Sequence, residues 1–172
     1  MRQGRRDGFR EFAAGRSGHL YRSACLLASG DTHLAEDLVQ ETLGRMYLLW
    51  GRISRIDNPA AYAQTVLVRA FLTHQRRRSA GERPLGEFPE PGGHQAAGAG
   101  DPLLRLTLLE ALGRLAPKDR AVLVLRYWED RSVEETADAM SVSSAAVRTR
   151  SSRALARLRE QLGGSLAEFA SH

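Results

Sequence analysis

A chain of 172 residues with 42% apolar residues is long enough to bury a hydrophobic core, as one domain or as two small ones. No apolar run approaches the ~20 residues of a membrane span, and the N-terminal segment lacks the apolar core of a signal peptide. We therefore expect a cytoplasmic protein without membrane insertion. The formal net charge of +5 favours a polyanionic partner, which could be nucleic acid or an anionic membrane surface.

Arginine supplies nearly all of the positive charge, because Lys118 is the sole lysine among 25 basic residues. The planar guanidinium suits bidentate contacts with phosphate and guanine. A GC-rich genome that biases codons towards arginine would explain the same ratio. The positions of the arginines must therefore distinguish phosphate or base contacts from codon bias. The single cysteine, Cys25, lies in an apolar run and is expected to be a buried packing residue in a reducing compartment.

Helical periodicity runs through almost the whole sequence, without an alternating strand pattern or an internal repeat. This periodicity predicts an all-α fold. The first helix is expected over residues 7–29, with Gly30 as its C-terminal cap. The chain restarts at Asp31 or Thr32, and the second helix ends near Gly51.

A third helix is predicted to start at Asn58 and Pro59, a capping residue followed by a proline at the first helical position. The helix ends in three consecutive arginines, Arg76, Arg77 and Arg78. These arginines either contact phosphates or mark a solvated helix end. The aromatic residues Tyr62 and Phe71 are expected in the core rather than stacked on unpaired bases.

Residues 79–100 concentrate proline, glycine and alanine, which is the composition of a flexible linker. They divide the chain into a first domain, residues 1–78, and a second domain, residues 101–172. The second domain opens with the cap pair Asp101 and Pro102. It is expected to be helical too, because the apolar run "AVLVL" follows a proline start and fits a buried helix better than a strand.

The second domain contains a predicted helix-turn-helix. Ser132 and Glu135 form a capping box before a short helix, a tight turn follows at residues 141–143, and a longer basic helix comes next. In such a motif the second helix enters the major groove of DNA. At 100° per residue its apolar stripe is Val147, Ala154, Leu155, Leu158 and Leu162. The opposite face holds Arg148, Thr149, Ser152 and Arg153.

Arg148 and Arg153 can reach base edges from that face, whereas a merely solvated basic helix is the alternative. Two serines depart from the usual pattern of the motif. Ser141 stands in the turn where glycine reaches a positive φ at low cost. Ser151 lies within the apolar stripe, where its hydroxyl must bond to a backbone carbonyl or pack poorly.

The second helix carries Asp37, Gln40 and Glu41 on one face. Asp37 and Glu41 form a like-charge pair at i and i+4, which costs a few tenths of a kcal/mol and which a basic partner would relieve. A solvated helix start stabilised by the helix dipole is the alternative. No histidine or cysteine shares this face, so neither a metal site nor catalysis is predicted.

The order of these parts resembles that of the extracytoplasmic-function sigma factors, small bacterial promoter-recognition subunits of RNA polymerase. "AEDLVQETLGRMYLLW" is similar to the polymerase-docking segment of the family, and "NPAAYAQTVLVRAFLTHQRRR" to its upstream-strand reading helix. "LGRLAPKDRAVLVLRYWEDRSVEETADAM" and "VRTRSSRALARLRE" resemble the remaining helices through the last one. The match covers nearly the whole chain.

The resemblance implies a two-domain adaptor with no catalysis and no cofactor, which binds core RNA polymerase and promoter DNA. It places Asp37, Gln40 and Glu41 at the polymerase and the third helix at the minus-ten element. The implied DNA contacts there are Arg69, Arg76, Arg77 and Arg78. At the minus-thirty-five element they are Arg148, Thr149, Arg150, Ser152 and Arg153.

Arg69 stands where many members of this family have asparagine. An anti-sigma protein is a further partner that the resemblance suggests. The alternative function is a stand-alone helix-turn-helix regulator that binds duplex DNA without polymerase.

Overall fold

The computed structural model describes residues 2–81 and 102–170, and every regular element in these two ranges is a helix. The first range holds α1 (Arg2–Leu27), α2 (Thr32–Leu48), α3 (Trp50–Ile53) and α4 (Pro59–Ala80). The second holds α5 (Pro102–Gly113), α6 (Pro117–Leu123), the π-helical turn η1 (Val124–Trp128), α7 (Val133–Met140) and α8 (Ser144–Ala170). The predicted all-α fold is confirmed. We call residues 2–81 the first half and residues 102–170 the second half.

Side-chain caps begin the helices of the first half where the sequence predicts them. Asp31 accepts a hydrogen bond from the Leu34 amide at 3.1 Å, and Asn58 accepts one from the Ala61 amide at 3.0 Å. Gly30 has a φ of +87° after the end of α1, a value that a residue without Cβ adopts at low cost. The predicted second helix is divided, because α2 ends at Leu48 and α3 follows.

Two sequence expectations at the start of the second half have different outcomes. The run "AVLVL" is helical, as predicted, and belongs to α6 and η1. The cap at Asp101 and most of the predicted linker lie outside the described residues, while residues 79 and 80 belong to α4.

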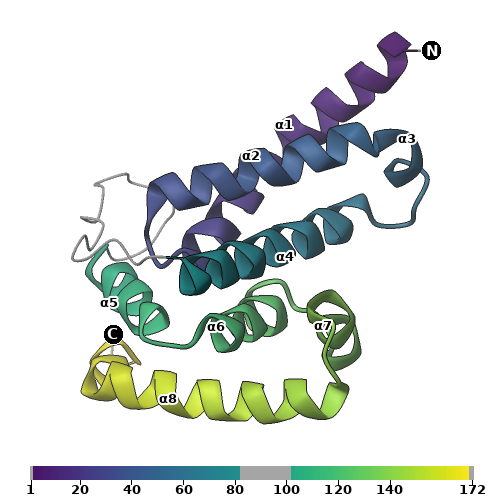
Figure 1. The fold of residues 1–172 in the computed structure, drawn as a ribbon. Coiled ribbons are helices and arrows are strands. Elements are labelled where there is room, and N and C mark those ends of the chain that lie inside the picture. The colour runs from purple at the N-terminus through teal and green to yellow at the C-terminus, as the bar shows by residue number, and fades with distance from the viewer. Residues whose placement is uncertain (1, 82–101, 171–172) are drawn as a thin grey trace.

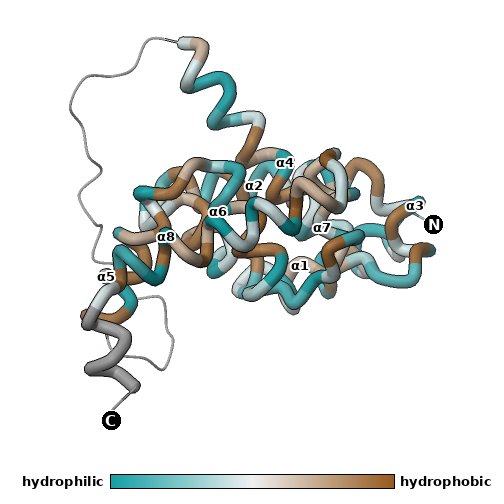
Figure 2. Tube along the Cα trace, turned by 90° about the horizontal axis from the view of Figure 1, so that it is seen from below, coloured by the Kyte–Doolittle hydropathy of each residue, from teal (hydrophilic) through white to brown (hydrophobic). Residues whose placement is uncertain are grey.

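The helices are stacked in layers (Figure 1). α2 packs on α1 and α4, and below α4 come α6 and α7, which rest on α8 at the base of the view. Figure 2 shows polar and apolar residues interspersed along the helices, as expected when one side of a helix faces the interior. The N-terminal end of α1 extends beyond the other helices (Figure 1).

The main hydrophobic core is shared by the two halves. From the first half it includes the fully buried Leu38 and Phe71, and from the second half Val122, Leu125 and Val147. Contacts between α4 and both α6 and α7 make this joint, with further contacts from α1. The second half therefore packs against the first.

Arg120 is the charged residue at the centre of this joint. It is 8% exposed, and it donates from Nη1 to the Leu27 carbonyl at 2.5 Å and from Nε to the Leu112 carbonyl at 2.9 Å. The Gly113 carbonyl at the end of α5 and the Leu115 carbonyl two residues further on accept from Nη2 at 3.4 and 3.2 Å. The guanidinium also lies 5.6 Å from the centre of the Phe71 ring.

These acceptors explain how a buried cation is tolerated here. The last carbonyls of a helix have no partner within the helix and carry the negative end of its dipole. Arg120 satisfies such carbonyls at the ends of α1 and α5 together. Burial lowers the pKa of Arg120 to about 10, so the side chain remains charged at neutral pH.

We predict that Arg120→Ala lowers the free energy of unfolding by about 3 kcal/mol or more, because it removes the donor of the Leu27, Gly113 and Leu115 carbonyls. Arg120→Lys should restore little, since one ammonium cannot reach acceptors on both helices. Urea unfolding followed by circular dichroism measures the change. Lys118→Ala, at an exposed neighbouring position, is the control and should stay within about 0.5 kcal/mol of the parent chain. An Arg120→Ala chain as stable as this control would contradict the role of Arg120.

Candidate nucleic-acid interface and docking surface

Local hydrogen bonds build the helix-turn-helix as the sequence predicts. The Ser132 hydroxyl accepts from the Glu135 amide at 3.0 Å, and the Glu135 carboxylate accepts from the Ser132 amide at 3.1 Å. This complete capping box starts α7. The same bonds lower the pKa of the Glu135 carboxyl, because they favour its charged form.

The turn between α7 and α8 needs a left-handed residue. Ser141 has φ 57° and ψ 45°, and the Val142 amide donates to the Ala137 carbonyl at 3.0 Å across the turn. The Ser143 hydroxyl then accepts from the Ala146 amide at 3.0 Å at the start of α8. Ser141 thus occupies the left-handed backbone conformation that glycine adopts at lower cost.

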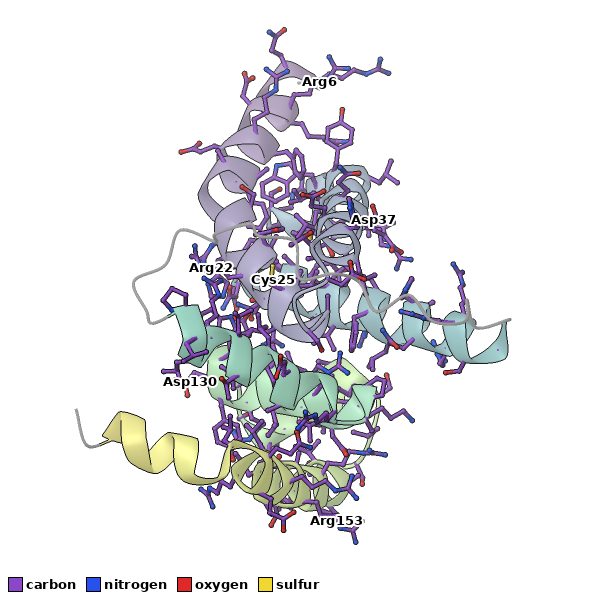
Figure 3. The ribbon with its side chains drawn as sticks, turned by 90° about the vertical axis from the view of Figure 1, so that its left-hand side faces the viewer. Arg6, Arg22, Cys25, Asp37, Asp130 and Arg153 are labelled. Carbon is purple, nitrogen blue, oxygen red and sulfur yellow. The ribbon has the colours of Figure 1, made fainter. Side chains whose placement is uncertain are left out.

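The two faces of α8 are divided as predicted. Val147 and Ala154 are fully buried, whereas Arg148, Thr149, Ser152 and Arg153 are exposed. Figure 3 shows Arg153 pointing away from the body of the protein. Arg148 makes a 3.5 Å ion pair with Glu134 of α7, but both side chains are more than 60% exposed, so this pair is weak and leaves Arg148 available to a ligand.

An open groove lies beside this basic face. Its volume is about 400 Å³, and its lining includes Thr149, Arg153 and Arg157. Asp119 lies at the same groove and accepts from Arg150 at 3.0 Å, with Arg157 at 3.8 Å. Arg150, a predicted DNA contact, therefore joins α8 to α6 in this structure.

Ser151 is buried on the inner face of α8, at 8% exposure. Its hydroxyl has no hydrogen-bond partner among the described residues. The bond to a backbone carbonyl, one of the two predicted outcomes for Ser151, is therefore absent. An unsatisfied buried hydroxyl costs on the order of 1–3 kcal/mol, so this position lowers the stability of the motif.

The predicted DNA contacts on α4 have two different environments. Arg76, Arg77 and Arg78 are exposed near the end of the helix. Arg69 lies nearer the middle, and its guanidinium donates to backbone carbonyls of Ala139 and Asp138 in α7. All four arginines are exposed, but Arg69 alone among them donates hydrogen bonds to the second half in this structure.

Tyr62 corrects one sequence expectation. Phe71 is fully buried as predicted, but Tyr62 is 37% exposed and lies at the surface. It borders an apolar hollow of about 290 Å³, together with Leu48 and Leu49 of the α2–α3 junction. Two arginines, Arg45 and Arg69, also line this hollow. The helical periodicity of the sequence does not predict this hollow, because the hollow forms where the α2–α3 junction meets α4.

The acidic face of α2 is accessible. Asp37, Gln40 and Glu41 are all exposed, and Figure 3 shows Asp37 on a different side of the protein from Arg153. Glu41 accepts from Arg45 at 3.0 Å, so the helix itself supplies one basic partner. Both side chains of that pair are about half exposed, which keeps its contribution small.

Within residues 2–81 and 102–170, no group of three or more histidine, cysteine or acidic side chains could hold a metal ion. None of the helices in these ranges is long and apolar enough to cross a membrane. Cys25 is buried as predicted, and burial is the main cause that raises the pKa of its thiol.

Comparison with known proteins matches each half of the chain to a different region of one protein family. The family model for sigma-70 region 2 matches residues 16–81, and that for sigma-70 region 4 matches residues 111–160. The RNA polymerase sigma-E factor of Streptomyces coelicolor is 39% identical over 155 residues, covering 90% of this chain and 85% of that protein. The sigma-E factor of Streptomyces avermitilis is 37% identical, covering 90% and 84%.

Two solved structures share the fold. The sigma factor RpoE of Bartonella quintana, in complex with the anti-sigma factor NepR, has a TM-score of 0.69 and 24% identity, covering 90% of this chain and 96% of that one. CnrH, in complex with the cytosolic domain of CnrY, has a TM-score of 0.62 and 21% identity, covering 91% and 88%. These likenesses extend over both halves.

The chain belongs to the sigma-70 family of RNA polymerase sigma factors, with regions 2 and 4 in its two halves. Within that family it is of the extracytoplasmic-function type and similar to sigma-E factors. It is therefore a non-enzymatic factor for transcription initiation that binds core RNA polymerase and promoter DNA.

The strained turn gives a testable prediction. Ser141→Gly should raise the free energy of unfolding by about 0.5–1 kcal/mol, because glycine adopts the left-handed conformation without the Cβ penalty. Ser141→Ala is the matched control and should give no such gain, since it keeps the Cβ. Thermal unfolding of the three chains under the same conditions measures the difference. Equal midpoints for the glycine and alanine variants would contradict the interpretation.

Proposed function

We propose that three surfaces of this sigma factor have separate binding roles in transcription initiation. The exposed face of α8 reads the minus-thirty-five element, α4 reads and helps to melt the minus-ten element, and the acidic face of α2 docks on core polymerase. The observation that carries this proposal is the outward set on α8. It consists of Arg148, Thr149, Ser152 and Arg153.

The chemistry of α8 supports direct base reading. The second helix of a helix-turn-helix lies in the major groove, and arginine forms bidentate hydrogen bonds with guanine O6 and N7. Arg148 lies near the N-terminal end of α8, from which such helices contact bases. Arg150 is tied to Asp119, so its contribution to DNA would come from charge rather than from base reading.

The surface of α4 supports contact with a melted strand. Arg76, Arg77 and Arg78 are exposed and suit phosphate groups. The hollow beside Tyr62 has apolar walls from Leu48 and Leu49, which suits the face of an unpaired base. The minus-ten element is the promoter segment that must be melted, and this hollow gives an extruded base a place to bind.

The acidic face of α2 complements a basic polymerase surface. Its carboxylates are exposed and lie on a different side of the protein from Arg153, so docking does not compete with reading by α8. We also propose that the protein acts in the cytoplasm, where polymerase and the chromosome are found. An anti-sigma protein is a further proposed partner, because the RpoE structure is a complex with one.

A stand-alone regulator is the alternative for the basic helix-turn-helix taken by itself. Run-off transcription from a genomic fragment library, with and without bacterial core polymerase, separates the two functions. Discrete transcripts that require both the chain and polymerase support the proposed division of work. Sequence-specific binding by the chain alone, without polymerase-dependent initiation, would favour the regulator.

Charge reversal tests the docking face. Asp37→Lys with Glu41→Lys should weaken binding to core polymerase at least roughly tenfold, since it places like charges opposite a basic surface. Pull-down and titration with labelled polymerase measure the effect. Asp7→Lys with Glu11→Lys, two exposed carboxylates at the same spacing on α1, makes the same change in net charge and should bind as the parent does. Equal losses from both pairs would show a general charge effect and reject the docking face.

Base reading by α8 is tested at Arg148. Arg148→Ala should cost about 1–3 kcal/mol at one base position of the minus-thirty-five element and little at others. Arg77→Ala should instead weaken binding evenly across promoter variants and reduce the salt dependence. Holoenzyme binding to a set of single-base promoter variants separates these results. A uniform loss from Arg148→Ala would contradict base reading by this residue.

A further inference from the structure

Three arginines lie along one flank of α8, beside its outward face. Arg150, Arg153 and Arg157 are three and four residues apart, a spacing that puts their side chains in one row on a helix. Like charges at this spacing destabilise a helix, and a nearby anion offsets their repulsion. The flank is therefore a place where negative charge is favoured.

Asp119 of α6 supplies one negative charge to this row. Its Oδ1 accepts from Arg150 at 3.0 Å, and its Oδ2 lies 3.8 Å from Arg157 Nη1. These two arginines are seven residues apart, or about 10.5 Å along the helix axis, so both side chains extend towards the same carboxylate. The Asp119 side chain is only 11% exposed, whereas the side chains of Arg150 and Arg157 are 36% and 61% exposed. A guanidinium has five N–H donors, so contact with Asp119 leaves most of them available.

The groove between α6 and α8 brings these groups together. α6 packs on α8 (Figure 1), and the groove of about 400 Å³ beside them is lined by the three arginines, Asp119 and Thr149. Three guanidiniums and one carboxylate give the lining a net positive charge. Arginine and threonine side chains are also common donors to phosphate oxygens in protein–DNA complexes.

We propose that this groove binds a phosphate group of the DNA backbone, with Arg150 and Arg157 as its ligands and Asp119 as the residue that positions them. The inference rests on the proposed contact of α8 with DNA. Thr149 and Arg153 belong both to the groove and to the outward face of α8. A helix in the major groove has a sugar–phosphate strand on each side, so a flank beside the reading face meets phosphates. The bound phosphate would fix the register of α8 on the duplex.

Positioning and simple charge predict opposite results for Asp119→Asn. The substitution removes a negative charge beside DNA, which by itself would tighten binding to a polyanion. It also removes the carboxylate that directs Arg150 and Arg157 into the groove. If that direction matters, the phosphate contact is lost and binding becomes weaker.

Holoenzyme binding to promoter DNA over a range of salt concentrations separates these two results. Asp119→Asn should weaken binding roughly fivefold to tenfold, as expected for the loss of hydrogen bonds to a charged group. The slope of log K against log salt should decrease by about 1, since one phosphate contact is lost. Asp119→Glu keeps the carboxylate and should bind more tightly than Asp119→Asn. Asp138→Asn, exposed on α7, makes the same change in charge and should bind at least as tightly as the parent.

A neutral methylphosphonate placed at each phosphate of the duplex in turn locates the contact. The parent chain should lose affinity roughly tenfold at one phosphate or at two adjacent ones, because the charge that the arginines bind is removed. Arg150→Gln should show little further loss at that phosphate, since the two changes remove the same interaction. Arg159→Gln, exposed on α8 outside the groove, removes the same charge and should lose affinity there as the parent does.

Inorganic phosphate tests a free anion as the other source of the same chemistry. Titration of the parent chain at constant ionic strength, followed by the nuclear magnetic resonance of the Thr149 and Arg150 amides, should show only weak binding. A phosphate outside the duplex lacks the neighbouring contacts that raise its effective concentration. Tight, saturable binding of inorganic phosphate, without a coupled position in the duplex, would assign the groove to a free anion and overturn the DNA contact.

The proposal is also overturned if Asp119→Asn binds as tightly as Asp138→Asn with an unchanged salt slope, or if no phosphate is coupled to Arg150. If Asp119→Asn loses its helical circular dichroism, the methylphosphonate series with Arg150→Gln decides alone. Failure of the proposed base reading has a different signature. Arg148→Ala would then show no base-specific loss, while the methylphosphonate series would still report whether the groove contacts the backbone.

Discussion

The guanidinium of Arg120 at the ends of two helices is the contact on which the joint of this protein depends. α1 and α5 belong to different halves, and each ends in carbonyls without partners in its own helix. One buried cation satisfies both ends and lies against Phe71 in the shared core. Removing it would leave polar atoms without partners inside an apolar joint, so this residue stabilises the packing of the two halves.

The same joint determines what separating the two halves would cost. Val122 and Leu125 are fully buried in the shared core, and separation of the halves would expose apolar surface around them. The two halves are therefore held together by buried apolar surface as well as by the hydrogen bonds of Arg120.

The sequence predicted those features that depend on neighbouring residues. The caps at Asp31, Asn58 and Ser132 are local, and the inward and outward faces of α8 follow from the helical period. Tyr62 was wrongly expected in the core, because its environment depends on where α2 and α3 meet α4. The burial of Arg120 and Arg131 could not be predicted either, since nothing near them in the sequence distinguishes a buried arginine from an exposed one.

The structure also separates two explanations of the arginine content. Arg120 binds carbonyls at the ends of both α1 and α5, and the buried Arg131 binds several acceptors on α4. The branched guanidinium provides donors in directions that a lysine ammonium cannot reproduce. Arg76, Arg77 and Arg78 are exposed, and there a lysine would supply the same charge to a phosphate. Codon bias therefore remains a sufficient explanation for arginine at many surface positions. The joint between the halves requires arginine, because only a guanidinium has the donor geometry that its acceptors need. The residue type that makes the protein basic also supplies hydrogen bonds that join its two halves.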